Sequence, residues 1–147
     1  MLLGLIARRW RLRLDDRLSA FGLTEAQWMT LLQLARGGEG RTQKELAARV
    51  NVEGPTLVRT LDRLEHEGLV ERRPAMDDRR AKAVYLTPKA APILRMIEDT
   101  AAAVRAELLV DVSDADLDTC LRVFDRLVVT LSAEPVITED DDGHRTA

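Results

Sequence analysis

The chain is poor in the residues that build covalent, metal-bound and catalytic frameworks. Its 147 residues include one cysteine, Cys120, and two histidines, His66 and His144. One cysteine excludes an internal disulfide framework and indicates a reducing compartment, and this ligand set is too small for a zinc finger. No Ser/His/Asp set, glycine-rich phosphate loop or paired-carboxylate cleft is visible. We therefore predict that the protein is not an enzyme and has neither a metal site nor a cofactor.

Long apolar runs are also missing. The apolar start at residues 1–7 is followed at once by Arg8 and Arg9, without the basic start or small-residue cleavage site of a signal peptide. No run is long enough for a membrane span. The length fits one domain, or one domain with a helical appendage, and 46% hydrophobic with 32% charged residues is ordinary globular composition. We expect a soluble, cytoplasmic protein without a membrane partner.

The charges are distributed unevenly around a formal net charge of −3. Residues 41–89 hold 11 Lys/Arg against 8 Asp/Glu, whereas residues 90–147 hold 5 Lys/Arg against 13 Asp/Glu. Such asymmetry orients a protein on a polyanion and keeps its other end away from it. Chance is the alternative explanation for an excess of this size.

Apolar residues at helical spacing predict helices at both ends of the chain. The first runs to about Ala20, and a capping box at residues 24–27 opens a second that reaches Arg36. A long helix is predicted from Thr87 to about Val110. The last helix follows a cap at Ser113 and carries a seam that steps by four and three, close to a heptad: Leu117, Leu121, Phe124, Val128 and Leu131. The first and last two helices cannot bury these faces on a small domain alone, so we predict a dimer.

The middle of the chain predicts a pair of short helices joined by a tight turn. Thr-Gln-Lys-Glu at 42–45 is a capping box, and Asn51 suits a left-handed helix end. Pro55 favours the start of the next helix, which runs to about Glu67 with Leu57, Leu61 and Leu64 on one face. A different face carries Thr56, Arg59, Thr60 and Arg63. This is helix-turn-helix spacing, and an Arg/Thr face at the helix start suits the major groove of DNA, the alternative being a solvated polar face.

A basic loop between two short strand-like runs follows. Residues 69–73 and 83–87 predict an antiparallel ribbon, whose tip carries Asp77, Asp78, Arg79, Arg80 and Lys82. A carboxylate beside the arginines can orient a guanidinium by a bidentate pair, and an oriented arginine suits a narrow minor groove. Arg72 and Arg73 on the ribbon favour phosphate contacts. A solubilising hairpin tip is the alternative.

Four segments together resemble the MarR family of transcriptional regulators, and its SlyA-like branch in particular. They are Gln-Lys-Glu-Leu-Ala at 43–47, Pro-Thr-Leu-Val-Arg-Thr-Leu-Asp-Arg-Leu-Glu at 55–65, Gly-Leu-Val at 68–70 and Asp-Arg-Arg-Ala-Lys at 78–82. The resemblance covers about residues 3–132. It implies a homodimer of winged helices on pseudo-palindromic operator DNA. It also implies base contacts from Pro55, Thr56 and Arg59, an arginine in the minor groove at Arg80, and a wing steadied by Asp78.

The resemblance further implies an effector pocket. Family members often bind aromatic carboxylates such as salicylate between the dimer helices and the DNA-binding lobe, and the matching positions are Arg8, Arg11, Trp28 and Leu32. Leu32 departs from the pattern, because SlyA-like proteins can carry a histidine there. Trp28 is alternatively a staple partner of Leu23. Cys120 lies beside the apolar seam of the last helix, where we expect a buried structural thiol.

We therefore predict a mainly α fold with a small β-ribbon, a winged helix-turn-helix with N- and C-terminal dimerisation helices. Residues 1–22 and 88–132 form the dimerisation region, 23–87 the DNA-binding domain and 133–147 a disordered acidic tail. The predicted function is sequence-specific transcriptional regulation, as a repressor or anti-silencer that small aromatic carboxylates release. The alternative is a ligand-binding or scaffolding helical dimer without operator function.

Overall fold

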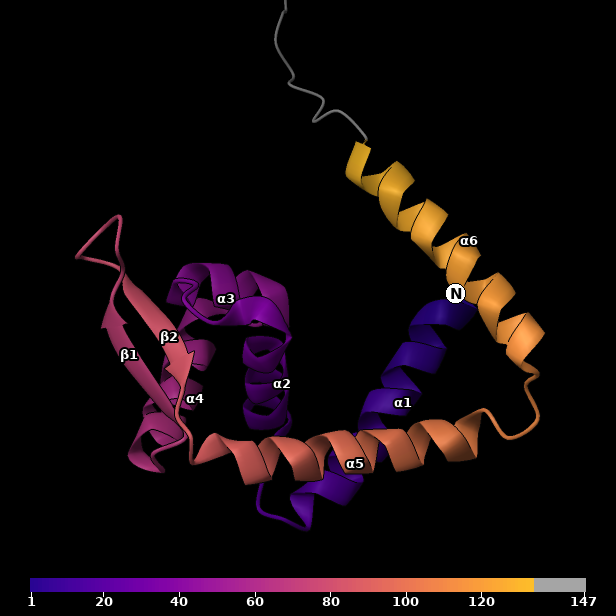
Figure 1. Cartoon of the computed structure of the whole chain (residues 1–147), viewed down its shortest axis with the longest axis horizontal. Helices are drawn as coiled ribbons and strands as arrows, with labels where there is room; N and C mark the ends of the chain where they lie inside the picture. The colour runs from indigo at the N-terminus through magenta and orange to yellow at the C-terminus, as the bar shows by residue number, and fades with distance from the viewer. Residues whose placement is uncertain (134–147) are drawn as a thin grey trace, which may run out of the picture. The chain divides into compact units, whose positions relative to one another are not determined.

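The computed structural model describes residues 1–133, and the predicted acidic tail lies outside these residues except for Ala133. The chain forms two compact units, one over Met1–Leu108 and one that begins at Leu109. The first unit (Figure 1) contains α1 (Leu2–Ser19), α2 (Glu25–Gln33), the π turn η1 (Leu34–Gly38), α3 (Gln43–Val50), α4 (Gly54–His66), β1 (Val70–Pro74), β2 (Lys82–Leu86) and α5 (Ala90–Leu108). The second contains α6 (Asp114–Ala133). The mainly helical fold with a two-stranded ribbon confirms the predicted class.

Side-chain caps fix where the helices start. Thr24 accepts the backbone N–H of Gln27, and Thr42 accepts that of Glu45, with the reciprocal bonds of a capping box in both places. Asn51 ends α3 in the left-handed region at φ 54° and ψ 47°. Each of these three features was predicted from the sequence.

The predicted end of the second helix is wrong by three residues. Regular α-helix stops at Gln33, and the chain continues through η1, where Arg36 (φ −88°, ψ 30°) and Gly37 (φ 93°) leave helical geometry. A positive φ suits glycine, which has no Cβ to clash with the backbone. The chain therefore turns here and reaches the ribbon before α3 begins.

The ribbon is antiparallel, and each strand lies one residue from its predicted position. Val70 pairs with Leu86 and Pro74 with Lys82. A third segment, residues 40–42, pairs with β2. Thr42 forms a β-bridge with Ala83. The N–H of Gly40 donates to the Val84 carbonyl at 2.9 Å, and the N–H of Val84 donates to the Arg41 carbonyl at 3.0 Å. This junction anchors the ribbon to the start of α3.

One apolar core unites the first unit. Helix α5 packs against α1 and α2, and α4 packs against α2, α3 and β1. The fully buried side chains come from all of these elements and include Leu18, Leu31, Leu46, Leu57, Leu61, Leu64, Val84, Ile97 and Val104. In Figure 1 the ribbon extends beyond α3 at one end of this unit, and its tip stands clear of the helices.

Asn51 should determine the turn between α3 and α4. We expect Asn51→Ala to lower the free energy of unfolding by about 1 kcal/mol, because alanine is less favourable than asparagine in the left-handed region that this residue occupies. Asn51→Gly, which removes the same side chain without that cost, is the matched control and should retain stability. Urea unfolding followed by circular dichroism measures both, and an equal loss in the two variants would contradict the backbone explanation.

Candidate nucleic-acid interface

Helix α4 has one face in the core and the opposite face in solvent. Leu57, Leu61 and Leu64 are at most 1% exposed. Arg59 and Arg63 are exposed, whereas Thr56 and Thr60 are half-buried. The Thr60 hydroxyl donates to the carbonyl of Thr56 at 2.9 Å, so its oxygen remains available as an acceptor.

The two arginines of this face differ in what they contact. Arg63 Nε donates to Glu67 Oε1 at 3.1 Å in an i,i+4 ion pair. Arg59 forms no ion pair within residues 1–133 and lies nearer the helix start, beside the exposed Pro55. A guanidinium that is exposed and unpaired can reach a base edge without first breaking an internal contact.

The wing tip is organised by Asp78, through the backbone. Its Oδ1 accepts the N–H of Arg80 at 2.9 Å, and its carbonyl accepts the N–H of Ala81 at 3.0 Å. From the sequence, we expected this carboxylate to orient a guanidinium. It instead closes the turn that carries Arg79 and Arg80. Both arginines and Lys82 are exposed, with no ion pair among the described residues.

Arg72 ties the ribbon to α4. Its guanidinium donates to Asp62 Oδ1 and to Glu65 Oε2, each at 2.6 Å, and to Gln43 Oε1 at 3.2 Å. Its backbone N–H also donates to Glu65 Oε1 at 3.1 Å. The Arg72 side chain is only 18% exposed. These contacts leave the guanidinium engaged rather than free for phosphate, so we assign it a positioning role in the proposal below.

The same contacts shift the acid–base behaviour of the pair. Hydrogen bonding from Arg72 holds the pKa of Glu65 below its usual range, and hydrogen bonding to Glu65 raises the pKa of Arg72. Arg73, next on the strand, pairs with Glu71 and places its guanidinium 4.6 Å from the ring centroid of Tyr85. The strand arginines thus have partners on the ribbon and α4, while those of the tip form no ion pair among the described residues.

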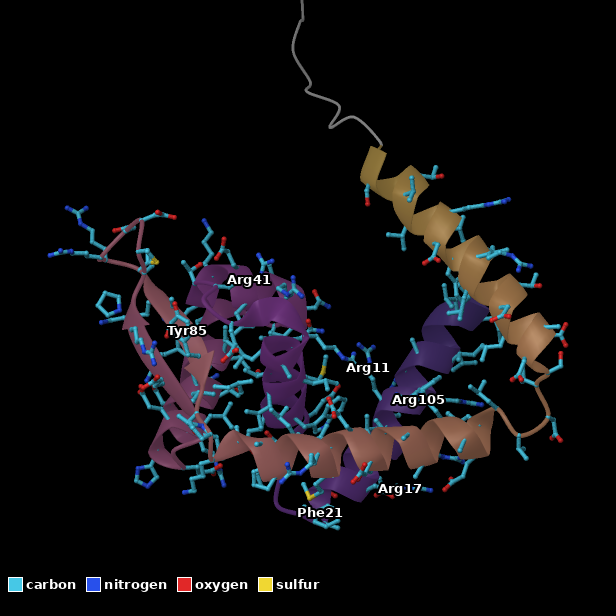
Figure 2. All side chains as sticks on the ribbon, in the orientation of Figure 1. Arg11, Arg17, Phe21, Arg41, Tyr85 and Arg105 are labelled. Atoms are coloured by element: carbon cyan, nitrogen blue, oxygen red, sulfur yellow. The ribbon has the colours of Figure 1, made fainter. Side chains whose placement is uncertain are left out.

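A cavity of about 320 Å³ lies between α1, α2 and α5. Three of the four predicted effector residues, Arg11, Trp28 and Leu32, line it, together with Trp10, Arg36 and Arg105. Figure 2 shows Arg11 and Arg105 in the space bounded by these helices. Arg8 is exposed on α1 and does not line the cavity, so it is left out of the proposed site.

Trp28 has two structural roles that the sequence offered as alternatives. It is 3% exposed and shares the core with Leu23, as a staple residue would. Its ring also forms part of the cavity wall, and its Nε1 donates to Asp15 Oδ1 at 3.2 Å. With the indole N–H occupied by Asp15, Trp28 presents an apolar ring to the cavity.

Other candidate chemistry is sparse in residues 1–133. No group of three His, Cys, Asp or Glu side chains gathers there as a metal-binding set. None of the helices in this part of the chain has the length and apolar character that crossing a bilayer requires. Cys120 is exposed in the single chain, contrary to the expected burial.

A helix-turn-helix followed by a basic antiparallel ribbon defines a winged helix DNA-binding protein. A family model described as MarR family matches residues 21–81. The solved structure of transcriptional regulator PA3341 is 46% identical, with a TM-score of 0.80 over 90% of this chain and 97% of that one. The chain belongs to the MarR family and is a DNA-binding transcriptional regulator rather than an enzyme.

Two structures of MarR from E. coli are also similar. The wild-type apo form is 26% identical with a TM-score of 0.74, covering 86% of this chain and 93% of that one. A variant in complex with operator DNA is likewise 26% identical, with a TM-score of 0.70 over 86% of this chain and 90% of that one. The fold described here is therefore similar to one that has been observed on DNA.

The Arg72 contacts predict a stability defect. We expect Arg72→Met to lower the free energy of unfolding by about 1–3 kcal/mol at pH 7, because it leaves Asp62 and Glu65 without their shared cation. Glu65 is more acidic in the folded chain than in the unfolded chain, so its contribution is present above the unfolded pKa and is lost as the pH falls through the folded pKa. The difference between wild type and variant should therefore shrink in acid.

Chemical denaturation at pH 7 and at pH 3 measures this difference. Arg79→Met, at the exposed wing tip, removes a cation without these contacts and serves as the control. If Arg72→Met and Arg79→Met were equally stable at pH 7, the positioning role of Arg72 would be refuted.

Proposed function

We propose that the protein binds pseudo-palindromic operator DNA as a homodimer and regulates transcription as a repressor or anti-silencer. The observation that supports this proposal best is the exposed start of α4, where Arg59 has no ion pair within the described residues and lies opposite a buried leucine stripe. The complex of the E. coli relative with operator DNA supports the same mode of binding.

In this proposal, the α4 face enters the major groove. Arg59 pairs with a guanine edge, and Thr56 contacts a thymine methyl group or a phosphate. Pro55 packs against a base edge at the helix start, while Thr60 and Arg63 line the surrounding surface and contact the DNA backbone. Base contacts then specify the sequence, while backbone contacts set the register.

The wing takes the second groove. Arg80 enters the minor groove, where a narrow A·T-rich segment has the most negative potential. Arg79 and Lys82 approach phosphates beside it. Asp78 holds the turn through the Arg80 backbone, and Arg72 holds the ribbon against α4.

Substitutions in α4 and in the wing should lower the affinity for operator DNA in different ways. We expect Arg59→Ala to cost roughly 1–3 kcal/mol and to relax specificity at one base pair of each half-site. Arg80→Ala should instead weaken operators according to the A·T content that flanks the half-sites. Selection from random duplexes, followed by binding measurements at fixed salt, tests both variants.

The control for loss of a cation is Arg95→Ala, on the exposed surface of α5. This variant should select the same operator with wild-type affinity. Wild-type protein that enriches no sequence would favour the alternative of a ligand-binding or scaffolding dimer without operator function. Arg59→Ala that weakens every duplex equally would make Arg59 a phosphate contact.

The dimer is proposed from apolar surface that each unit leaves exposed. The first turns of α1 expose Leu2, Leu3, Leu5 and Ile6. Helix α6 exposes a row of large apolar side chains, among them Leu121, Phe124, Val128 and Leu131. Monomeric proteins rarely leave contiguous apolar surface of this kind in water, so we propose that the first and last two helices join two chains.

Charge on the α6 row should disrupt this dimer. We expect Leu121→Asp with Val128→Asp, at positions 51% and 62% exposed in the single chain, to yield monomer or insoluble protein. Arg122→Asp on the same helix is the control for a new negative charge, since it replaces an exposed polar residue. Sedimentation velocity measures the outcome, and a monomeric wild type would contradict the proposed architecture.

We also propose that a small aromatic carboxylate such as salicylate occupies the α1–α2–α5 cavity and weakens operator binding, as in a SlyA-like branch of the family. The cavity volume, its two tryptophans and its arginines support this idea. A ligand there acts only through unequal affinity for the free and DNA-bound shapes of the dimer.

A further inference from the structure

The α1–α2–α5 cavity carries more positive charge than a single carboxylate requires. Arg11 comes from α1, Arg36 from η1 and Arg105 from α5, and all three line the same space. Among the described residues that line the cavity, none is Asp or Glu. None of these three arginines forms an ion pair within residues 1–133.

Acidic residues close by in the sequence have other partners. Asp15, one helical turn after Arg11, accepts the Trp28 indole N–H at 3.2 Å. Glu107, two residues after Arg105, pairs with Arg17 at 2.6 Å. Hydrogen bonding from Arg17 also lowers the pKa of Glu107, which keeps it ionised and paired. Neither acid forms an ion pair with a cavity arginine in the described part of the chain, so the three guanidinium groups remain available to an anionic ligand.

The remaining wall is apolar and aromatic. Trp10 and Trp28 both line the cavity, and Trp28 offers only its ring because its N–H is bound to Asp15. A volume of about 320 Å³ lies at the small end of ligand pockets, room for a planar ring with substituents. Guanidinium groups around such a ring recognise carboxylates by paired N–H donors.

Of the three cavity arginines, Arg36 is the one that lies in a segment of irregular backbone. It lies in η1 with φ −88° and ψ 30°, immediately before Gly37 at φ 93°. Single π turns of this kind are frequent at functional sites. Arg36 therefore contributes a cation from the end of the second helix, separate from those of α1 and α5.

Resting on the proposed effector site, we propose that its ligand is an aromatic acid with two anionic groups. One group pairs with Arg36, the other pairs with Arg11 or Arg105, and the ring lies against Trp10 and Trp28. A monocarboxylate such as salicylate satisfies one guanidinium and leaves the others to solvent. A dicarboxylate gains a second charge-assisted pair for the same buried ring.

The experiment titrates DNA-free protein with benzoate, benzene-1,3-dicarboxylate and benzene-1,4-dicarboxylate at pH 7.5 and constant ionic strength. Intrinsic fluorescence reports occupancy, since the chain's two tryptophans are those of the cavity wall. Calorimetry provides the dissociation constants. We expect at least one dicarboxylate to bind about tenfold or more tightly than benzoate, the effect of one additional charged hydrogen-bonded pair.

Two substitutions locate the second anionic group. Arg36→Gln should remove the preference for the dicarboxylate and leave benzoate binding within about twofold. Arg95→Gln, an exposed arginine of α5 outside the cavity, is the matched control and should retain the preference. Arg36 is itself exposed, and circular dichroism verifies that both variants fold.

Equal affinity of wild-type protein for benzoate and both dicarboxylates would overturn the proposal, as would no binding of any of the three. A preference that persists in Arg36→Gln would overturn the role of Arg36. Operator binding, measured separately on the same samples, distinguishes these failures from failure of the proposed function. A dicarboxylate that binds tightly without weakening operator binding would support the ligand class while contradicting effector release.

Discussion

The buried leucine stripe of α4 is the constraint on which the DNA-reading surface depends. Leu57, Leu61 and Leu64 have almost no exposure, and losing one such side chain costs about 2–5 kcal/mol. A surface ion pair such as Arg63–Glu67 contributes at most about 1 kcal/mol. The apolar stripe therefore decides how α4 is rotated, and the outward direction of Arg59 follows from that rotation without an ion pair of its own in residues 1–133.

The position of the wing relative to α4 has a different physical origin. A two-stranded ribbon is marginally stable alone, and only part of this one is buried, through Val70, Ala83 and Val84. A further restraint, beside the bonds of residues 39–42 to β2, comes from Arg72, which binds Asp62 and Glu65, three residues apart on α4. The charges of α4 thus have separate tasks, because the acids hold the wing while Arg59 remains free. Asp78 completes the arrangement by closing the tip through a backbone N–H.

Features determined by neighbouring residues could be predicted from the sequence, and features determined by packing could not. The capping boxes at Thr24 and Thr42 and the left-handed Asn51 are local, and all three were predicted correctly. The contacts of Arg72 span 7, 10 and 29 positions, so no local pattern distinguishes this arginine from a phosphate ligand. Arg8 was predicted in the cavity from a resemblance, but residues 1–9 are all exposed in the single chain, and Arg8 does not line the cavity. Arg36 and Arg105 line the same cavity because of the way α5 crosses α2. The spacing of residues in the sequence does not predict this crossing.

The π turn joins a cavity residue to a segment that is hydrogen-bonded to the wing. Arg36 lines the cavity, and four residues later the backbone N–H of Gly40 binds the Val84 carbonyl at 2.9 Å. Glu39 accepts the N–H of Leu86 at 2.7 Å, so two successive residues of this segment are bonded to β2. The backbone at Gly40 also packs closely against Tyr85, since a Cβ at Gly40 would lie 3.4 Å from the Tyr85 hydroxyl. Between Arg36 and these bonds to β2, Gly37 has φ 93°, and its carbonyl accepts a hydrogen bond from Arg41 Nε at 3.4 Å. The cavity residue Arg36 and strand β2 are thus connected through a short turn whose positive φ at Gly37 suits glycine.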